Sequence, residues 1–140
     1  MSEVRDKFLK LLQRGIQKDA SDIHLKTNCP VYYRVDGNVE AQHEVIISPS
    51  DIENCVEILL GAEQKKHFIK RGEIDLAFTE KGVGRFRVNI FRQRGLVSIV
   101  MRRIKTKMLT FEQLNLPNAA LKLAEYVRGL VLITGTTGSG

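Results

Sequence analysis

The end of the sequence constrains the fold more than any other stretch. Residues 130–134 read Leu-Val-Leu-Ile-Thr, a short and continuously apolar run, and residues 135–140 follow directly as Gly-Thr-Thr-Gly-Ser-Gly. A short apolar run bounded by glycine is typical of a parallel strand that is buried on both faces of an α/β sheet. We therefore expect residues 129–140 to form the first strand and the following loop of an α/β domain.

The glycines in this stretch have a spacing that phosphate-binding loops use. Gly135 and Gly140 match the two glycines of the P-loop pattern GxxxxGK[ST], in which backbone N–H groups surround the phosphates, the lysine reaches the outer phosphates and the hydroxyl holds Mg²⁺. We expect the lysine and the hydroxyl at positions 141 and 142, so these 140 residues alone should not hydrolyse nucleotide. An ordinary glycine- and serine-rich turn is the alternative interpretation. The predicted phosphate-binding residues are Gly135, Thr136, Thr137, Gly138, Ser139 and Gly140.

The composition is typical of a globular protein that buries a core. Hydrophobic residues make up 43% and charged residues 27% of the chain. No apolar run approaches the roughly 18 residues of a membrane span, and the polar start lacks the apolar core of a signal peptide. Cys29 and Cys55 form no CxxC pattern and no ligand cluster with the three histidines. We therefore expect reduced thiols, a cytosolic location and no metal site within the chain.

Positive charge is concentrated in one segment of the chain. Residues 85–107 contain eight of the 22 basic residues and no acidic residue, which leaves 14 basic and 16 acidic residues elsewhere. We therefore expect an anionic partner to contact this segment.

Hydrophobic spacing and turn residues predict an α+β domain over residues 1–105. Apolar residues at three- and four-residue steps predict a helix over residues 3–18, and Ser48 followed by proline predicts a second helix over residues 49–60. A tight turn at residues 36–38 joins two strands. The expected strands cover residues 21–25, 31–35, 39 onward, 74–79, 83–91 and 96–104, and a further short helix covers residues 63–70.

Residues 106–128 are expected to connect the two domains. Thr110 and Gln113 have the spacing of a capping box, which predicts a short helix that Pro117 ends. Residues 119–126 are expected to form another helix. The expected organisation is therefore a domain over residues 1–105, a connector over residues 106–128 and the start of an α/β domain over residues 129–140.

The basic segment includes a strand with one polar face. Period-two alternation places Arg85, Arg87 and Asn89 on the face opposite to the apolar side chains, and two guanidinium groups with an amide suit a polyphosphate. Two other interpretations remain open. The face could be solvated and form ion pairs with neighbours such as Asp75, or it could bind nucleic acid. No RNP, KH or zinc-finger pattern accompanies the strand, which argues against nucleic acid.

Asp22 and His24 alternate with apolar residues in the first expected strand. No nucleophile or metal ligand accompanies them in the sequence. We interpret both side chains as structural or interfacial.

Several stretches taken together resemble the secretion and pilus ATPase family, in particular the type IV pilus retraction (twitching motility) motors of the PilT/PilU kind. The resemblance covers nearly the whole chain in order. Its matching stretches are residues 20–25, 34–37 and 84–89 with Phe91 and residues 93–94, then residues 114–117, 128–131 and 135–140. Lys105 stands where the PilT branch commonly has proline, which favours the PilU-like branch.

The resemblance implies a PAS-like N-terminal domain joined to a RecA-like ATPase domain, assembled as a homohexamer that uses ATP and Mg²⁺. It implies that Arg87 contacts ATP, and that Arg85 and Arg102 are candidate catalytic residues of the arginine-finger kind, which stabilise the charge of phosphoryl transfer. The implied partners are a platform protein of the inner membrane and the pilus base, on the cytoplasmic side and without membrane insertion.

Two alternatives to pilus retraction remain. Within the family, the chain could belong to a pilus-extension or type II secretion ATPase, although Asp22 lies so close to Met1 that we expect no additional N-terminal domain. Outside the family, it could be a non-catalytic module whose basic strand binds an acidic partner or nucleic acid.

Overall fold

The structure, a computed structural model, describes residues 2–105 and 110–136. The chain divides into two units, Met1–Thr106 and Lys107–Gly140.

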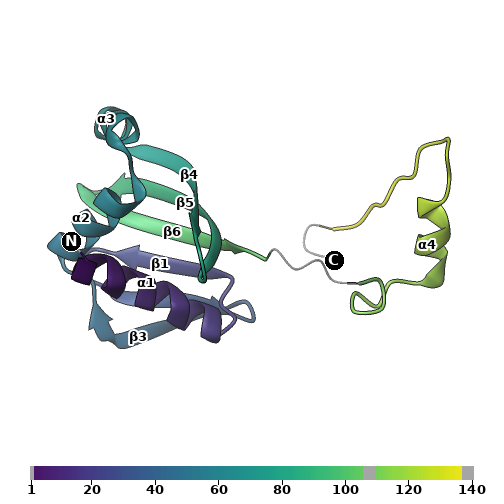
Figure 1. The fold of residues 1–140 in the computed structure, drawn as a ribbon, viewed down its shortest axis with the longest axis horizontal. Coiled ribbons are helices and arrows are strands. Elements are labelled where there is room, and N and C mark those ends of the chain that lie inside the picture. The colour runs from purple at the N-terminus through teal and green to yellow at the C-terminus, as the bar shows by residue number, and fades with distance from the viewer. Residues whose placement is uncertain (1, 106–109, 137–140) are drawn as a thin grey trace. The chain divides into compact units, whose positions relative to one another are not determined.

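Six strands of the first unit form one antiparallel sheet with the strand order β3-β2-β1-β6-β5-β4 (Figure 1). The first and last strands of the unit, β1 and β6, are therefore neighbours at the centre of the sheet. This pairing brings together residues that are about 80 positions apart in the sequence. The strands are β1 (Asp22–Lys26), β2 (Pro30–Val35), β3 (Asn38–Ile46), β4 (Glu73–Glu80), β5 (Gly84–Gln93) and β6 (Leu96–Ile104), which confirms the six expected strands.

Two tight turns fix the register of the hairpins. Asp36 and Gly37 join β2 to β3 with φ values of 47° and 81°, and Arg94 and Gly95 join β5 to β6 with φ values of 52° and 79°. Two successive residues of positive φ are the hallmark of the type I′ turn, whose twist matches that of paired strands. The expected hairpin at residues 36–38 is confirmed.

Three helices complete the first unit: α1 (Ser2–Gln17), α2 (Pro49–Leu59) and α3 (Ala62–Arg71). Each expected helix is present. Ser48 caps α2 as the sequence predicts, because its Oγ accepts a hydrogen bond from the Asp51 N–H at 3.1 Å while the Ser48 N–H donates to the Asp51 carboxylate at 3.0 Å.

The core lies between the sheet and the helices α1 and α2, which cover one of its faces (Figure 1). Gly15 allows α1 to approach closely, because a Cβ at this position would lie 2.8 Å from Cδ1 of Ile23. Tyr33 reaches α1 from β2 and donates its hydroxyl proton to the carbonyl oxygen of Leu11 at 2.8 Å. Within residues 2–105 no helix covers the opposite face, which we call the open face.

The second unit contains one helix, α4 (Asn118–Ala124), among its described residues. Thr110 and Gln113 exchange the two hydrogen bonds of a capping box, at 3.0 Å and 3.3 Å. The short helix expected after them is nevertheless absent, because residues 111–115 form only turns. Pro117 follows within two residues, and a single helical turn does not offset the cost of nucleation.

The buried parallel strand predicted at residues 130–134 is wrong. These residues have no regular structure, and their side chains are exposed, with 82% exposure for Leu130 and 92% for Ile133. A parallel strand needs a neighbouring strand and helices over both faces, and the described part of this unit supplies no second strand. Gly135 and Thr136 continue the same irregular segment, whereas the predictions for Thr137, Gly138, Ser139 and Gly140 lie outside the described residues.

Candidate anion-binding site

The alternation predicted for the basic strand is confirmed in β5. Phe86, Val88 and Ile90 are fully buried on the covered face of the sheet. Arg85 and Arg87 are exposed on the open face.

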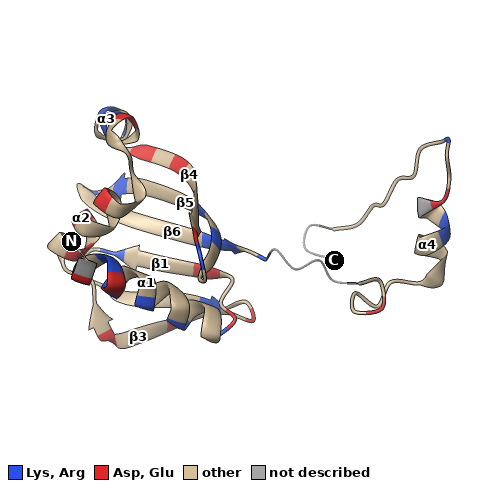
Figure 2. Cartoon of the chain, viewed as in Figure 1, with Lys and Arg blue, Asp and Glu red and all other residues tan. Residues whose placement is uncertain are grey.

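The sheet register places a second arginine directly beside Arg87. Arg87 of β5 and Arg102 of β6 are Cα partners on neighbouring antiparallel strands, and Figure 2 shows the basic segments of these strands side by side. Both side chains are 71% exposed. Two like charges directly opposite each other destabilise a sheet, so this pair favours an anion bound on the open face.

Asp22 of β1 lies opposite Arg102 on the other side of β6. Its Oδ1 accepts a hydrogen bond from Nε of Arg102 at 3.0 Å, and its Oδ2 lies 3.4 Å from Nε of Arg34. Ser21 also donates its hydroxyl proton to Oδ2, at 2.7 Å. Only 7% of the Asp22 side chain is exposed. Burial by itself raises the pKa of Asp22, but the hydrogen bonds from Ser21 and Arg102 and the two arginine charges outweigh it, so the pKa lies below its ordinary value.

Arg87 has a looser carboxylate neighbour. Its Nε lies 3.8 Å from Oδ1 of Asp75 on β4, and both side chains are exposed. The alternative interpretation of a solvated strand face predicts this ion pair. In Arg102 the carboxylate of Asp22 lies close to Nε, and in Arg87 that of Asp75 does. Within the described part of the chain, the Nη nitrogens of these two arginines donate no hydrogen bond. Free Nη nitrogens are suited to bidentate binding of phosphate.

These groups line an open depression of about 340 Å³ on the open face. Arg85 lies one step further along the same face of β5, opposite Ile104, and does not line the depression. The structure therefore brings together Arg87 and Arg102 of the predicted site residues, with Arg85 beside them. The lining residues are Asp75, Arg87, Asn89, Val100 and Arg102.

Sequence reasoning missed the contacts of Asp22 with Arg102, which lines the depression, and with Arg34. Asp22 was interpreted as structural or interfacial, and no local pattern links it to an arginine 80 positions later. The one available signal is the acidic residue in a strand where polar and apolar residues alternate, because a carboxylate that becomes buried there needs a hydrogen-bonding or charged partner.

A neighbouring depression of about 380 Å³ surrounds His24, with Tyr32 and Phe91 among its walls. His24 Nε2 is buried and has no hydrogen-bond partner within the described part of the chain. Burial lowers the pKa of His24, while the charges of Asp22 and Arg34 act in opposite directions, the first raising and the second lowering it. The imidazole is therefore neutral near pH 7 and adds no positive charge to the arginine site.

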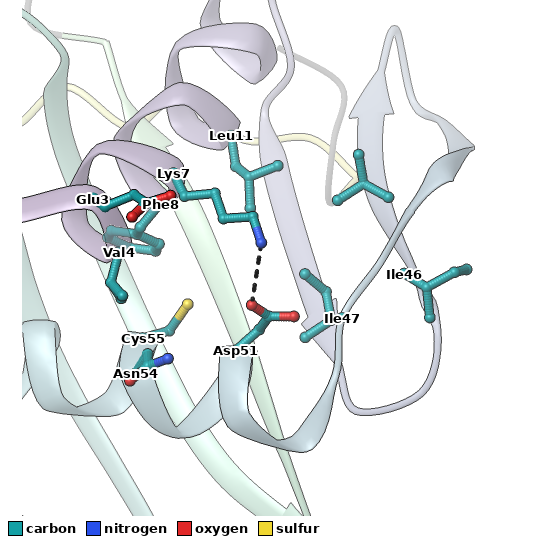
Figure 3. A pocket seen from close by; sticks show the side chains of 11 residues that line it. Glu3, Val4, Lys7, Phe8, Leu11, Ile46, Ile47, Asp51, Asn54 and Cys55 are labelled. Carbon is teal, nitrogen blue, oxygen red and sulfur yellow. Dashed lines mark ion pairs between the residues drawn. The ribbon is translucent and has the colours of Figure 1, made fainter.

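A third cavity, of about 200 Å³, lies between α1, α2 and the end of β3 (Figure 3). Its main polar feature is the ion pair of Lys7 with Asp51 at 3.7 Å, and Asp51 already caps α2. Burial raises the pKa of Cys55 to about 12, so this thiol stays protonated and is no nucleophile at neutral pH.

Two further findings limit the kinds of site in the described part of the chain. No group of three or more His, Cys, Asp or Glu side chains is arranged to hold a metal ion there. The helices in the same residues are also too short or too polar to cross a membrane.

Comparison of the chain with known proteins shows the family that it belongs to. The family model described as "Type II/IV secretion system protein" matches residues 2–140. The type IV pilus ATPase PilU of Pseudomonas aeruginosa is 38% identical over 133 residues, which cover 95% of this chain and 35% of that protein. The type IV pilus retraction ATPase PilT of the same organism is 36% identical over 131 residues, which cover 94% of this chain and 38% of that protein.

A solved structure shows the same similarity. The crystal structure of the pilus retraction motor PilT with bound ADP matches with a TM-score of 0.81 and 34% identity, over 94% of this chain and 39% of that chain. The chain thus spans between a third and two fifths of the length of these relatives.

Proposed function

Because the chain belongs to the type II/IV secretion system protein family, we propose that it is the N-terminal part of a hexameric motor ATPase that drives type IV pilus retraction. The support comes from the relatives named PilU and PilT, which are 38% and 36% identical. In this proposal residues 1–105 form a PAS-like domain and residues 129–140 begin a RecA-like ATPase domain. The motor acts on the cytoplasmic side of the inner membrane, on a platform protein at the pilus base.

The facing pair of Arg87 and Arg102 is the observation that carries the proposal. Their free Nη nitrogens, beside one depression, fit the polyphosphate of ATP. Arg87 contacts ATP, and Arg102 supplies a second positive charge to the phosphates. Arg85 has a smaller part, because it lies outside the depression.

The proposed chemistry of this surface is electrostatic. In phosphoryl transfer, negative charge is spread over the oxygens of the transferred group, and fixed guanidinium groups stabilise it. Asp22 and Asp75 are each paired with an arginine. The proposal therefore assigns Mg²⁺ to the hydroxyl expected at position 142 rather than to these carboxylates.

The test is Mg²⁺-dependent ATP hydrolysis by the protein from the complete reading frame. We expect Arg87→Ala to lower kcat about 100-fold, the magnitude typical for loss of one charge-stabilising donor, and Arg102→Ala to lower it by a similar or smaller factor. Lys81→Ala, in the exposed turn between β4 and β5, is the matched control and should leave the rate unchanged. Normal turnover of both arginine variants would exclude the assignment of this surface to ATP. No hydrolysis by the complete wild-type protein would favour a non-catalytic binding module.

The family description names type II secretion, so a type II secretion ATPase is an alternative within the family, and a pilus-extension ATPase is another. Deletion of the gene distinguishes them: loss of twitching with retained surface pili indicates retraction, loss of pili indicates extension, and loss of protein secretion indicates a type II system.

A further inference from the structure

One buried carboxylate lies within a row of arginines on the open face. The register aligns Arg87 of β5, Arg102 of β6, Asp22 of β1 and Arg34 of β2 across four adjacent strands. Asp22 pairs with two of these guanidinium groups, those of Arg102 and Arg34, whereas Arg87 pairs with Asp75. The acid is the buried member of the row, with 7% of its side chain exposed, whereas the arginines reach the solvent.

The contacts of Asp22 determine which part of Arg102 remains free. A guanidinium group has five N–H donors, of which Nε carries one and the Nη nitrogens carry four. Asp22 accepts the Nε–H of Arg102 at 3.0 Å. Its own orientation is fixed by the hydroxyl of Ser21 at 2.7 Å. The Nη nitrogens of Arg102 are thus left for a ligand in the depression beside Arg87.

We propose that Asp22 is a positioning residue of the phosphate site, which holds Arg102 by Nε and so orients its Nη nitrogens toward the anion beside Arg87. This inference rests on the proposed function, because it takes Arg87 and Arg102 as the phosphate-binding pair. A guanidinium group that is already held in place loses less conformational entropy when it binds an anion.

Asp75 provides a built-in comparison. It belongs to the same depression and approaches Nε of Arg87, but at 3.8 Å and with both side chains exposed. An exposed ion pair at this distance orients its partner weakly. Positioning by Asp22 should therefore matter more for phosphate binding than positioning by Asp75.

Charge and position make opposite predictions for the loss of Asp22. If Asp22 acted only as a nearby negative charge, Asp22→Asn would make the site more positive and would tighten anion binding. If Asp22 positions Arg102, the same substitution loosens the guanidinium group and weakens binding. The direction of the change in affinity therefore decides between the two.

The experiment titrates the 140-residue chain with inorganic tripolyphosphate at low ionic strength and follows binding by calorimetry. We expect Arg102→Ala to weaken binding about tenfold, Asp22→Asn about three- to tenfold and Asp75→Asn less than about twofold. In the double variant with Arg102→Ala, Asp22→Asn should cause no further loss, because Asp22 acts through Arg102. Tighter or unchanged binding by Asp22→Asn would overturn the inference, as would a full additional loss in the double variant.

Failure of this inference and failure of the proposed function give different results. If Arg87→Ala and Arg102→Ala both bind tripolyphosphate like the wild type, the phosphate site itself is wrong. If they lose affinity and Asp22→Asn does not, only the positioning role is wrong.

A measurement on the wild-type chain covers the case in which Asp22→Asn does not fold. The Nε–H of Arg102 should exchange with solvent more slowly than that of Arg87 in NMR spectra, and it should stay protected when tripolyphosphate is added. Equal exchange of the two protons, or loss of protection on binding, would overturn the inference.

Discussion

On the covered face of the sheet, Phe86 and Val88 of β5 are fully buried, whereas on the open face Arg87, between them in the sequence, is 71% exposed. The covered face of this strand thus contributes to stability, and its open face, in our proposal, contributes to anion binding. The covered face removes apolar surface from water and supplies stability. The open face sets like charges opposite each other, at a cost to the sheet that an anionic ligand would offset. Adjacent residues should therefore respond to mutation in different assays.

The largest expected effect is on the covered face. Phe86→Ala should lower the free energy of unfolding by about 3–5 kcal/mol, because it removes a fully buried aromatic side chain and leaves a cavity. Urea denaturation of the 140-residue chain, followed by circular dichroism, measures this change. A loss below about 1 kcal/mol would mean that the core around β5 is far less tightly packed than the structure shows.

A smaller effect is expected at Asp22, which belongs to the open face yet is buried. The pKa of Asp22 is lowered in the folded chain, so its ionised form stabilises the fold. This contribution is fully present above the ordinary pKa of 3.8 and is lost as the pH falls through the lower pKa of the folded state. Asp22→Asn should therefore cost about 2 kcal/mol at pH 7, the scale of hydrogen bonds to a charged group, and less at pH 3.

The pH dependence separates Asp22 from the other acids. Asp19 and Asp51 also have lowered pKa values, from the contacts with Lys105 and Ser48 respectively, so the wild type alone does not report on Asp22. The difference in unfolding free energy between wild type and Asp22→Asn isolates the one carboxylate. A difference that is the same at pH 7 and pH 3 would contradict the network of Asp22 with its arginines.

The covered face could be predicted from the sequence, and the open face only in part. The alternation in residues 85–90 separates buried from exposed side chains, because period two is a property of any single strand. Which strands pair with each other, in contrast, depends on how the whole sheet is assembled. The pairing of β1 with β6 joins residues about 80 positions apart, and without it neither the Asp22–Arg102 contact nor the facing of Arg87 and Arg102 could be inferred.

The same reasoning explains why residues 130–134 were predicted wrongly. Their apolar composition is that of a buried strand, but composition alone provides no partner strand. A helix such as α4 closes its hydrogen bonds within itself, and the structure contains it close to its expected place. A parallel strand depends on other segments for every backbone hydrogen bond, so its formation requires residues that the described chain does not contribute.

The smallest expected change in stability is at Arg87. Its substitution tests most directly whether the covered and open faces of β5 have different roles. Arg87→Ala removes an exposed side chain whose one ion pair, with Asp75 at 3.8 Å, contributes little. It also removes the repulsion with Arg102. These two terms oppose each other, so the free energy of unfolding should change by less than about 0.5 kcal/mol and can even rise. Binding of tripolyphosphate should nevertheless weaken about tenfold, as for Arg102→Ala.

Lys81→Ala is the matched control for this prediction, because it also removes an exposed cation but lies in a turn away from the depression. It should change neither stability nor binding. A similar loss of binding in both variants would mean that net charge attracts the anion without a defined site. A loss of stability above 1 kcal/mol in Arg87→Ala would mean that the open face contributes to the fold as the covered face does, and the division of roles between the two faces of β5 would then be wrong.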